Sequence, residues 1–249
     1  MPEIHVVGVP GLPEIARGAD LGALIANAVT KRIGTVEIGD VFVVAQKIVS
    51  KAEGAIVRLD EVTPSPAAEE WAAAHQKDPR LIEVIFRESR RIVRMAHGVL
   101  IAETHHAFVC ANAGVDTSNV PQGFATLLPR DPDASAARLR DALMSALGCS
   151  VAVIVSDTFG RPWREGVANV AIGAAGIRPL LDYRGCADSF GRTLQSTVIA
   201  IADELASAAE LVMRKTTGTP VAIVRGAAEW SGEGSARMLV RDASRDLFR

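Results

Sequence analysis

VAVIVS, at residues 151–156, is the clearest strand signal in the chain, because it is a short apolar run rich in β-branched residues. Such runs are typical of strands that are buried on both faces of a sheet. Upstream, residues 133–147 carry leucines at helical spacing, which predicts a helix capped by Asp133 and ended by Gly148. A helix followed directly by a buried strand indicates an α/β arrangement.

The remaining chain repeats both signals. Apolar runs predict further strands at residues 4–9, 40–49, 167–175 and 221–225. Helical periodicity predicts helices after Asp20, over residues 66–76, from Pro79 onward and over residues 197–213. Residues 92–112 contain short strands separated by turn signals and predict an antiparallel meander. The expected fold class is therefore mixed α/β (α+β), with mixed or antiparallel sheets.

The chain lacks a Pro/Ser-rich linker, a charge block or an internal repeat, so residues 1–249 are expected to form a single compact unit. Its 27 basic and 29 acidic residues leave a net charge of −2, which argues against a protein that binds nucleic acid by neutralising phosphates. The three cysteines indicate no disulfide framework. With no signal peptide and no apolar run of about 18 residues, the protein is expected to be cytoplasmic and without a membrane partner.

Two polar segments that follow predicted strands are the candidates for chemistry, since the common nucleotide, zinc and hydrolase motifs are absent. Residues 112–119 (NAGVDTSN) contain Asp116, and residues 157–165 (DTFGRPWRE) contain Asp157 and Thr158. Carboxylates and hydroxyls are the ligands that Mg²⁺ and Mn²⁺ prefer. Asp and Asn also favour ordinary turns through local hydrogen bonds, so the pattern alone leaves both interpretations open.

Two further segments are ambiguous in the same way. The loop PGLPEI at residues 10–15 could bring backbone N–H groups close to an anion or a base edge, or it could simply connect two elements. Lys51 could contact a phosphate or lie in solvent. Neither segment identifies a function by itself.

Longer strings are more specific than these patterns. VFVVAQKIVSKAEG (41–54), FVCANAGVDTSNV (108–120) and VAVIVSDTFGRPWREG (151–166) follow one another in this order. With these strings, the chain resembles the coenzyme F420:L-glutamate ligase family over essentially its whole length. The resemblance implies a mixed α/β fold and an intertwined homodimer. It also implies that no nitroreductase-like domain, as found in fused relatives, belongs to residues 1–249.

The resemblance further implies a reaction. GTP, as co-substrate, phosphorylates a carboxylate of the coenzyme F420 precursor, and the amine of L-glutamate then displaces phosphate to form an amide. The first addition takes place at the lactyl carboxylate, and later ones take place at the γ-carboxylate of the glutamate already attached. Mg²⁺ or Mn²⁺ is the implied cofactor, and K⁺ is a further candidate.

The resemblance assigns roles to twelve residues. The implied metal ligands are Asp116, Asp157 and Thr158, of which the two aspartates are also the implied catalytic residues. The implied nucleotide-binding residues are Leu12, Pro13, Glu14, Ile15, Gln46, Lys51, Asn119, Lys215 and Thr216.

The loop at residues 213–220 departs from the family pattern. Many relatives carry Gly and then Gln or Glu after the Met of this loop, and that side chain is a ligand of a second metal. This chain has Arg214, Lys215 and Thr216 after Met213. We therefore expect Lys215 to supply part of the missing charge, with Thr216 as a substitute oxygen ligand, unless the loop is a solvated turn. At position 46 the chain has Gln where several relatives have Ser.

Two alternatives remain on the sequence alone. The altered loop is compatible with a related metal-dependent amide ligase that uses a different acid or amine. A non-catalytic deazaflavin- or nucleotide-binding protein is the other alternative. Such a protein would be expected to have lost Asp116 or Asp157, and both are present.

Overall fold

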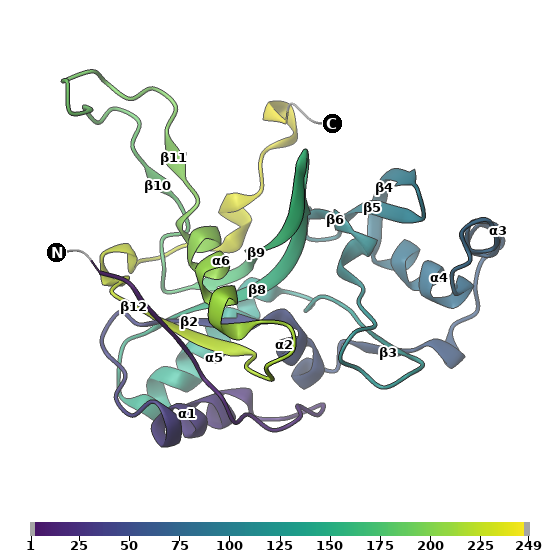
Figure 1. The fold of residues 1–249 in the computed structure, drawn as a ribbon, viewed down its shortest axis with the longest axis horizontal. Helices are drawn as coiled ribbons and strands as arrows, with labels where there is room; N and C mark the ends of the chain where they lie inside the picture. The colour runs from purple at the N-terminus through teal and green to yellow at the C-terminus, as the bar shows by residue number, and fades with distance from the viewer. Residues whose placement is uncertain (1–2, 247–249) are drawn as a thin grey trace.

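A five-stranded sheet forms the centre of the molecule. The structure is a computed structural model that describes residues 3–246. The strands run in the order β1 (His5–Gly8), β12 (Val221–Arg225), β2 (Val41–Ala45), β8 (Ala152–Arg161) and β9 (Arg164–Ala175) (Figure 1). β2 and β8 are parallel, and the other neighbours are antiparallel. The expected mixed α/β class is confirmed.

Apolar cores cover both faces of this sheet. One core is formed by α1 (Leu21–Arg32), α2 (Gln46–Glu53) and α5 (Pro132–Leu147). The core on the other face is formed by α6 (Ile201–Met213). Alternate residues of β8 contribute to the two cores: Val153 and Val155 to the first, and Ala152 and Ile154 to the second. This double burial explains why the strand is apolar at every position from Ala152 to Val155.

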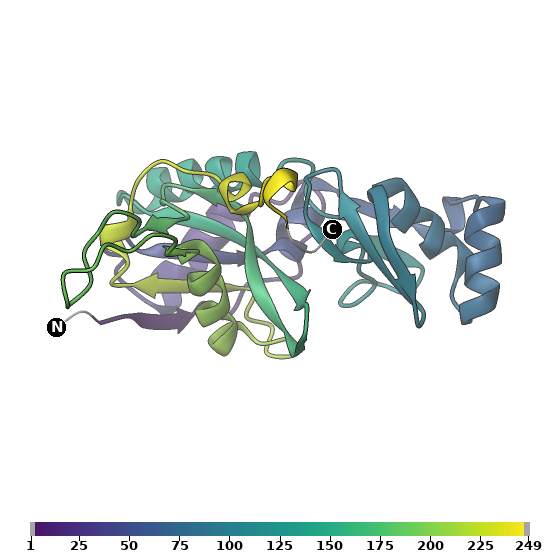
Figure 2. The same cartoon turned by 90° about the horizontal axis from the view of Figure 1, so that it is seen from above.

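Residues 56–126 form a smaller lobe at one end of the molecule (Figure 2). Its helices are α3 (Pro66–His75) and α4 (Pro79–Glu88), and its strands are β3 (Ile56–Arg58), β4 (Ser89–Ala96), β5 (Val99–Thr104), β6 (Val109–Ala111) and β7 (Phe124–Thr126). β4, β5 and β6 form an antiparallel meander, as expected for residues 92–112. Ile82, Ile85 and Leu100 lie in a separate apolar core of this lobe.

A narrow arm projects from the central sheet (Figure 1). It contains the short pair β10 (Leu181–Asp182) and β11 (Val198–Ile199). The expected helix over residues 197–213 is therefore wrong at its start, because Val198 and Ile199 pair with β10 and α6 begins only at Ile201.

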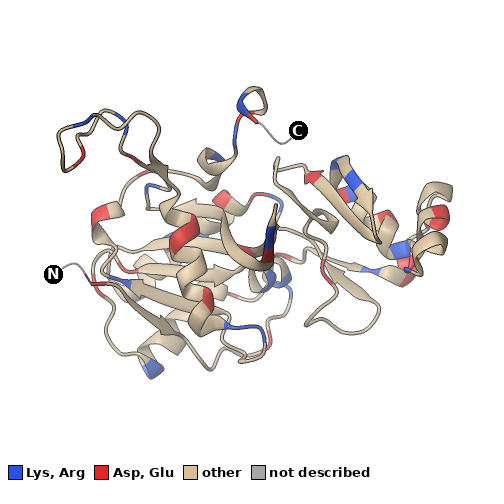
Figure 3. Cartoon of the chain, turned by 45° about the horizontal axis from the view of Figure 1, so that its top comes forward, with Lys and Arg blue, Asp and Glu red and all other residues tan. Residues whose placement is uncertain are grey.

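Acidic and basic residues are interspersed along the chain (Figure 3). This mixture agrees with the net charge of −2. In the part of the chain that the structure describes, no helix has both the length and the apolar character needed to cross a membrane.

Two further expectations about elements are wrong. The apolar run at residues 40–49 is split, with β2 ending at Ala45 and α2 beginning at Gln46. α2 ends at Gly54, which adopts the left-handed conformation (φ 74°) that favours glycine.

α5 is capped by Asp131, which accepts from the Ala134 N–H at 3.0 Å, because Pro132 suits the first helical position. Asp133 instead accepts a backbone N–H from β9, at Ala174.

The polar segment that begins at Asp157 was expected to follow the strand at residues 151–156, but its first residues belong to the strand itself. β8 continues to Arg161, and it pairs with β9 so that Asp157 lies opposite Val170 and Thr158 lies opposite Asn169. The antiparallel partner keeps these polar residues in an extended strand. Asp157 and Thr158 are consequently held by a hairpin of the central sheet.

Candidate functional site

A cavity of about 670 Å³ lies between the central sheet and the smaller lobe. Its wall is formed by segments far apart in the sequence: the N-terminal loop, α2, the loop after β6, the hairpin β8–β9 and the end of α6 with the following loop. All twelve residues singled out by the resemblance line it: Leu12, Pro13, Glu14, Ile15, Gln46, Lys51, Asn119, Lys215, Thr216, Asp116, Asp157 and Thr158. The structure thus brings the residues together, while their individual roles stay predictions.

Lys51 joins the N-terminal loop to α2. Its ammonium group forms an ion pair with the carboxylate of Glu14, and the Lys51 side chain is only 8% exposed. Ile15 is buried beside this pair and anchors the loop in the first core. The two segments therefore form one wall of the cavity.

Gln46 is the first residue of α2, and its side chain bonds to the protein itself. The amide nitrogen Nε2 donates to Ser50 Oγ at 2.6 Å and to the carbonyl of Leu127 at 2.8 Å. Gln46 is buried, so these bonds connect α2 to the segment after β7. In this arrangement the amide nitrogen is occupied by these two acceptors.

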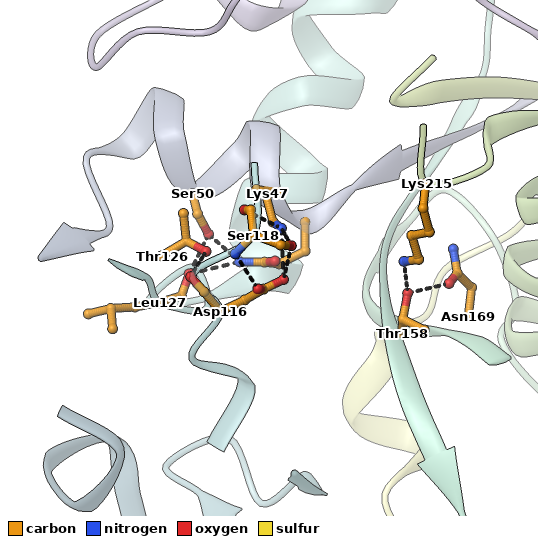
Figure 4. Close-up of polar contacts among 10 residues, drawn as sticks. Lys47, Ser50, Asp116, Ser118, Thr126, Leu127, Thr158, Asn169 and Lys215 are labelled. Carbon is orange, nitrogen blue, oxygen red and sulfur yellow. Dashed lines mark hydrogen bonds and ion pairs between the residues drawn. The ribbon is translucent and has the colours of Figure 1, made fainter. Parts of the chain in front are cut away.

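Asp116 is held by hydrogen bonds and by a cation (Figure 4). Lys47 Nζ donates to Asp116 Oδ2 at 2.7 Å, and the Ser118 N–H donates to Oδ1, also at 2.7 Å. Burial raises the pKa of Asp116, but the bonds from Lys47 and Ser118 outweigh it and hold the pKa below its usual value. The backbone of Asp116 pairs with Thr126, which fixes the loop to β7. Asn119 follows in the left-handed conformation, with φ 53°.

Asp157 has a different environment. Burial raises its pKa to about 6, against a backbone hydrogen bond from Thr158 that lowers it, and the charge of Asp116 raises it further. The charge of Lys215 lowers the pKa, but among residues 3–246 no Lys, Arg or His forms a salt bridge with Asp157. Asp157 is half-buried, and a partly desolvated carboxylate without a contacting cation is a favourable position for a bound cation.

Thr158 lies in a second group of polar contacts, separate from that of Asp116 (Figure 4). Its hydroxyl donates to Asn169 Oδ1 at 2.7 Å and accepts a hydrogen bond from Lys215 Nζ. Asn169 Nδ2 donates in turn to Glu210 Oε2 at 3.0 Å. Lys215 and Thr216 belong to the exposed loop after α6.

Four polar cavity residues were missed by the sequence analysis: Lys47, Ser156, Asn169 and Glu210. Lys47 and Lys51 are four residues apart, so recognising α2 as a helix would have placed both on one face. Asn169 and Glu210 have no local signal, because their contacts depend on strand pairing and helix packing. Ser156 is buried, and its Oγ has no hydrogen-bond partner within the described residues, which leaves it available to a ligand.

The donor set of the cavity fits a hard divalent cation. Across residues 3–246 there is no group of three or more His, Cys, Asp or Glu side chains that could hold a metal ion by itself. Asp116, Asp157 and Thr158 offer two carboxylates and a hydroxyl instead. Mg²⁺ is usually held by one or two carboxylates and completes its coordination with substrate phosphates and water.

Comparisons with known proteins cover nearly the whole chain. The family model for F420-0:Gamma-glutamyl ligase matches residues 11–226.

A protein of Methanothermobacter thermautotrophicus is 46% identical over 250 residues, which cover 99% of both chains. One of Methanopyrus kandleri is 47% identical over 254 residues, which cover 100% of this chain and 99% of that protein. A Methanocaldococcus jannaschii protein is 45% identical over 215 residues, 86% of each. All three are named coenzyme F420:L-glutamate ligase. The resemblance is thus confirmed, and the chain belongs to the F420-0:gamma-glutamyl ligase family.

Proposed function

We propose that this chain is a GTP-dependent ligase that joins L-glutamate to the coenzyme F420 precursor. Relatives with this ligase name align over 86–100% of the chain at 45–47% identity. The observation that carries the proposal is that all of the residues implied for metal and nucleotide line one and the same cavity. A cavity of about 670 Å³ is within the size range of small-molecule sites.

The proposed reaction has two steps. In the first, a carboxylate oxygen of the precursor attacks the γ-phosphorus of GTP, so that a new O–P bond forms and the bond to GDP breaks. In the second, the amine of L-glutamate attacks the activated carbonyl carbon. The C–N bond forms, the C–O bond to phosphate breaks, and the amine gives up a proton. The first addition is at the lactyl carboxylate, and repetition at a γ-carboxylate adds further glutamates.

Asp116, Asp157 and Thr158 are the proposed holders of Mg²⁺ or Mn²⁺. When bound, the cation offsets charge that builds up on the transferring phosphoryl group. Lys47 and Lys51 line the same cavity and bring two ammonium groups to positions where they can meet phosphate oxygens. K⁺ remains a further candidate cofactor for this set of oxygen donors.

Lys215 is proposed to cover part of the charge that a second metal supplies in relatives. Its ammonium group contacts the hydroxyl of Thr158, a proposed metal ligand. This contact supports the role, since a cation beside a metal ligand lies near any phosphate bound there. Thr216 is the proposed substitute oxygen ligand.

A homodimer is proposed as the assembly. The two hairpins that project from the sheet expose large apolar side chains, with Trp163 80% and Phe190 87% exposed. Aromatic residues such as Trp and Phe are enriched at protein–protein interfaces relative to the rest of the surface. Light scattering of the purified protein tests the stoichiometry.

Mass spectrometry of the precursor after incubation with GTP, Mn²⁺ or Mg²⁺ and L-glutamate tests the function. The expected product is heavier by whole glutamyl residues and appears together with GDP. Reactions without GTP, or with the Asp157→Asn variant, serve as controls. Mass growth with another amine but not with L-glutamate would indicate the related amide ligase, and binding without any product would indicate a non-catalytic protein.

Nucleotide choice is tested separately. The loop at residues 12–15 is proposed to read the guanine base, so kcat/KM should be higher for GTP than for ATP. Equal values would remove this loop from the account of specificity.

A further inference from the structure

The hydrogen bonds around Thr158 form a directed chain. Glu210 Oε2 lies 3.0 Å from the amide nitrogen Nδ2 of Asn169, and Asn169 Oδ1 lies 2.7 Å from Thr158 Oγ1. Asn169 is only 4% exposed, so its amide has few alternatives to these two partners. Each polar atom in this series of hydrogen bonds therefore has a defined role as donor or acceptor.

The roles follow from the chemistry of the groups. An ionised Glu210 can only accept, so the NH₂ end of the Asn169 amide must face it. The carbonyl end of Asn169 must then face Thr158, and a carbonyl can only accept. The single hydrogen of the Thr158 hydroxyl is therefore directed at Asn169. The oxygen lone pairs of Thr158 are left for other donors or cations, and Lys215 occupies one of these positions.

We propose that Glu210 and Asn169 are positioning residues that turn the hydroxyl oxygen of Thr158 toward the cavity as a ligand for a cation. The inference rests on the proposed function, because it assumes that Thr158 helps to hold the divalent cation. It adds two residues that act through Thr158 and that need not touch the cation themselves.

The packing of α6 on β9 holds Glu210 in place. Asp203, Ser207 and Glu210 follow one another at helical spacing and lie on one face of α6. Asp203 accepts from the Ala171 N–H at 2.9 Å, and Ser207 Oγ donates to the Asn169 carbonyl at 2.7 Å. The register of β8 and β9 shifts at this point, so the helix supplies hydrogen bonds where the ladder is irregular. The same contacts fix the distance from Glu210 to Asn169.

Mn²⁺ binding to the full chain without nucleotide tests the inference, with the free ion measured by electron paramagnetic resonance. Glu210→Met removes the acceptor at nearly constant size, and we expect Mn²⁺ to bind about 10-fold more weakly, within the range known for residues behind metal ligands. Glu210→Gln keeps an oxygen that can accept from Asn169 and should stay within about threefold of the wild type. Glu204→Met, at an exposed position of the same helix, is the matched control and should change nothing.

A double-mutant cycle with Thr158→Val shows whether Glu210 acts through the hydroxyl. In the Thr158→Val background, Glu210→Met should change the Mn²⁺ affinity by less than about twofold, because the group it orients is gone. An undiminished loss in that background would overturn the inference. Equal losses for Glu210→Gln and Glu210→Met would also overturn it, since the carboxylate would then act by its charge or as a ligand.

The outcome for Asp157→Asn separates this inference from the proposed function. If Asp157→Asn weakens Mn²⁺ binding and Glu210→Met does not, the metal site stands and the positioning role is wrong. If Asp157→Asn leaves Mn²⁺ binding unchanged, the proposed metal site is wrong and the positioning role is wrong with it. Thermal unfolding verifies that each variant folds, and Glu210→Ala replaces Glu210→Met if the latter does not.

Discussion

The two carboxylates of the cavity are held in opposite ways. Asp116 lies on a loop, with Lys47 and Ser118 bonded to its oxygens, so its charge is balanced within the protein. Asp157 lies in the middle of β8, without a contacting cation among the described residues, and burial raises its pKa to about 6. Lys47 therefore balances the charge of Asp116, and the proposed cation would do the same for Asp157.

The largest expected effect is on ligation. Asp116→Asn and Asp157→Asn should each abolish activity and leave the fold intact, because each removes a negative ligand from the proposed two-carboxylate metal site. We expect kcat/KM to fall by more than about 100-fold, beyond the loss typical of residues behind metal ligands. Steady-state assays at saturating metal measure this. Near wild-type turnover of either variant would show that its metal assignment is wrong.

In the metal-free protein, Asp116→Asn and Asp157→Asn should change the stability in opposite directions. Asp157→Asn should raise the free energy of unfolding at pH 7 by up to about 3 kcal/mol, because it removes a carboxyl whose pKa is raised to about 6 in the folded protein. Asp116→Asn should lower it, because Lys47 then loses its partner. Thermal unfolding in EDTA measures both, and a change of the same sign in both variants would contradict the comparison.

The contribution of Asp157 to the pH dependence of the free energy of unfolding has a definite sign. A carboxyl with a raised folded-state pKa holds its proton longer in the folded protein than in the unfolded chain. For Asp157 the wild type should therefore lose stability as the pH rises from about 4 to about 6, and Asp157→Asn should lack this contribution. Unfolding curves of the two proteins across this range provide the test.

Lys215 provides a test next to Asp157, because its ammonium group contacts the hydroxyl of Thr158. Lys215→Ala should lower kcat by about 10-fold and steepen its dependence on metal concentration, because one ammonium group beside the phosphates is removed. Thr216→Ala should have a smaller effect. If the loop is only a solvated turn, both variants will keep the wild-type rate and the wild-type metal dependence.

The smallest effect is expected for the loop that carries Asp116. Thr126→Val removes the bond from Thr126 Oγ1 to the Asp116 carbonyl but keeps the backbone bonds between the same two residues. The free energy of unfolding should fall by about 1 kcal/mol, with ligation nearly unchanged. A loss of ligation as large as that of Asp116→Asn would mean that this hydroxyl also positions the carboxylate.

Local patterns were sufficient for most of the elements. Asp20 caps α1 by accepting from the Ala23 N–H at 3.0 Å, and the pair Asp78–Pro79 starts α4 as expected. α2 was missed because its apolar residues Ile48 and Val49 come only two residues after the end of β2, and a short apolar run does not distinguish strand from helix. The cap of α5 was displaced by two residues because Asp131 and Asp133 offer the same side chain.

In the candidate site, too, the sequence predicted some features and left others to the tertiary structure. Sequence motifs and the family resemblance were enough to name twelve residues that line one cavity. The motifs could be recognised because each is a short continuous stretch of sequence. The partners of these residues could not be named. Glu210 meets Asn169 across 41 residues, and Lys215 meets Thr158 across 57. Caps and periodicity arise from interactions within a few residues, whereas these contacts exist only once α6 has packed on β9 and the loop after α6 lies against β8.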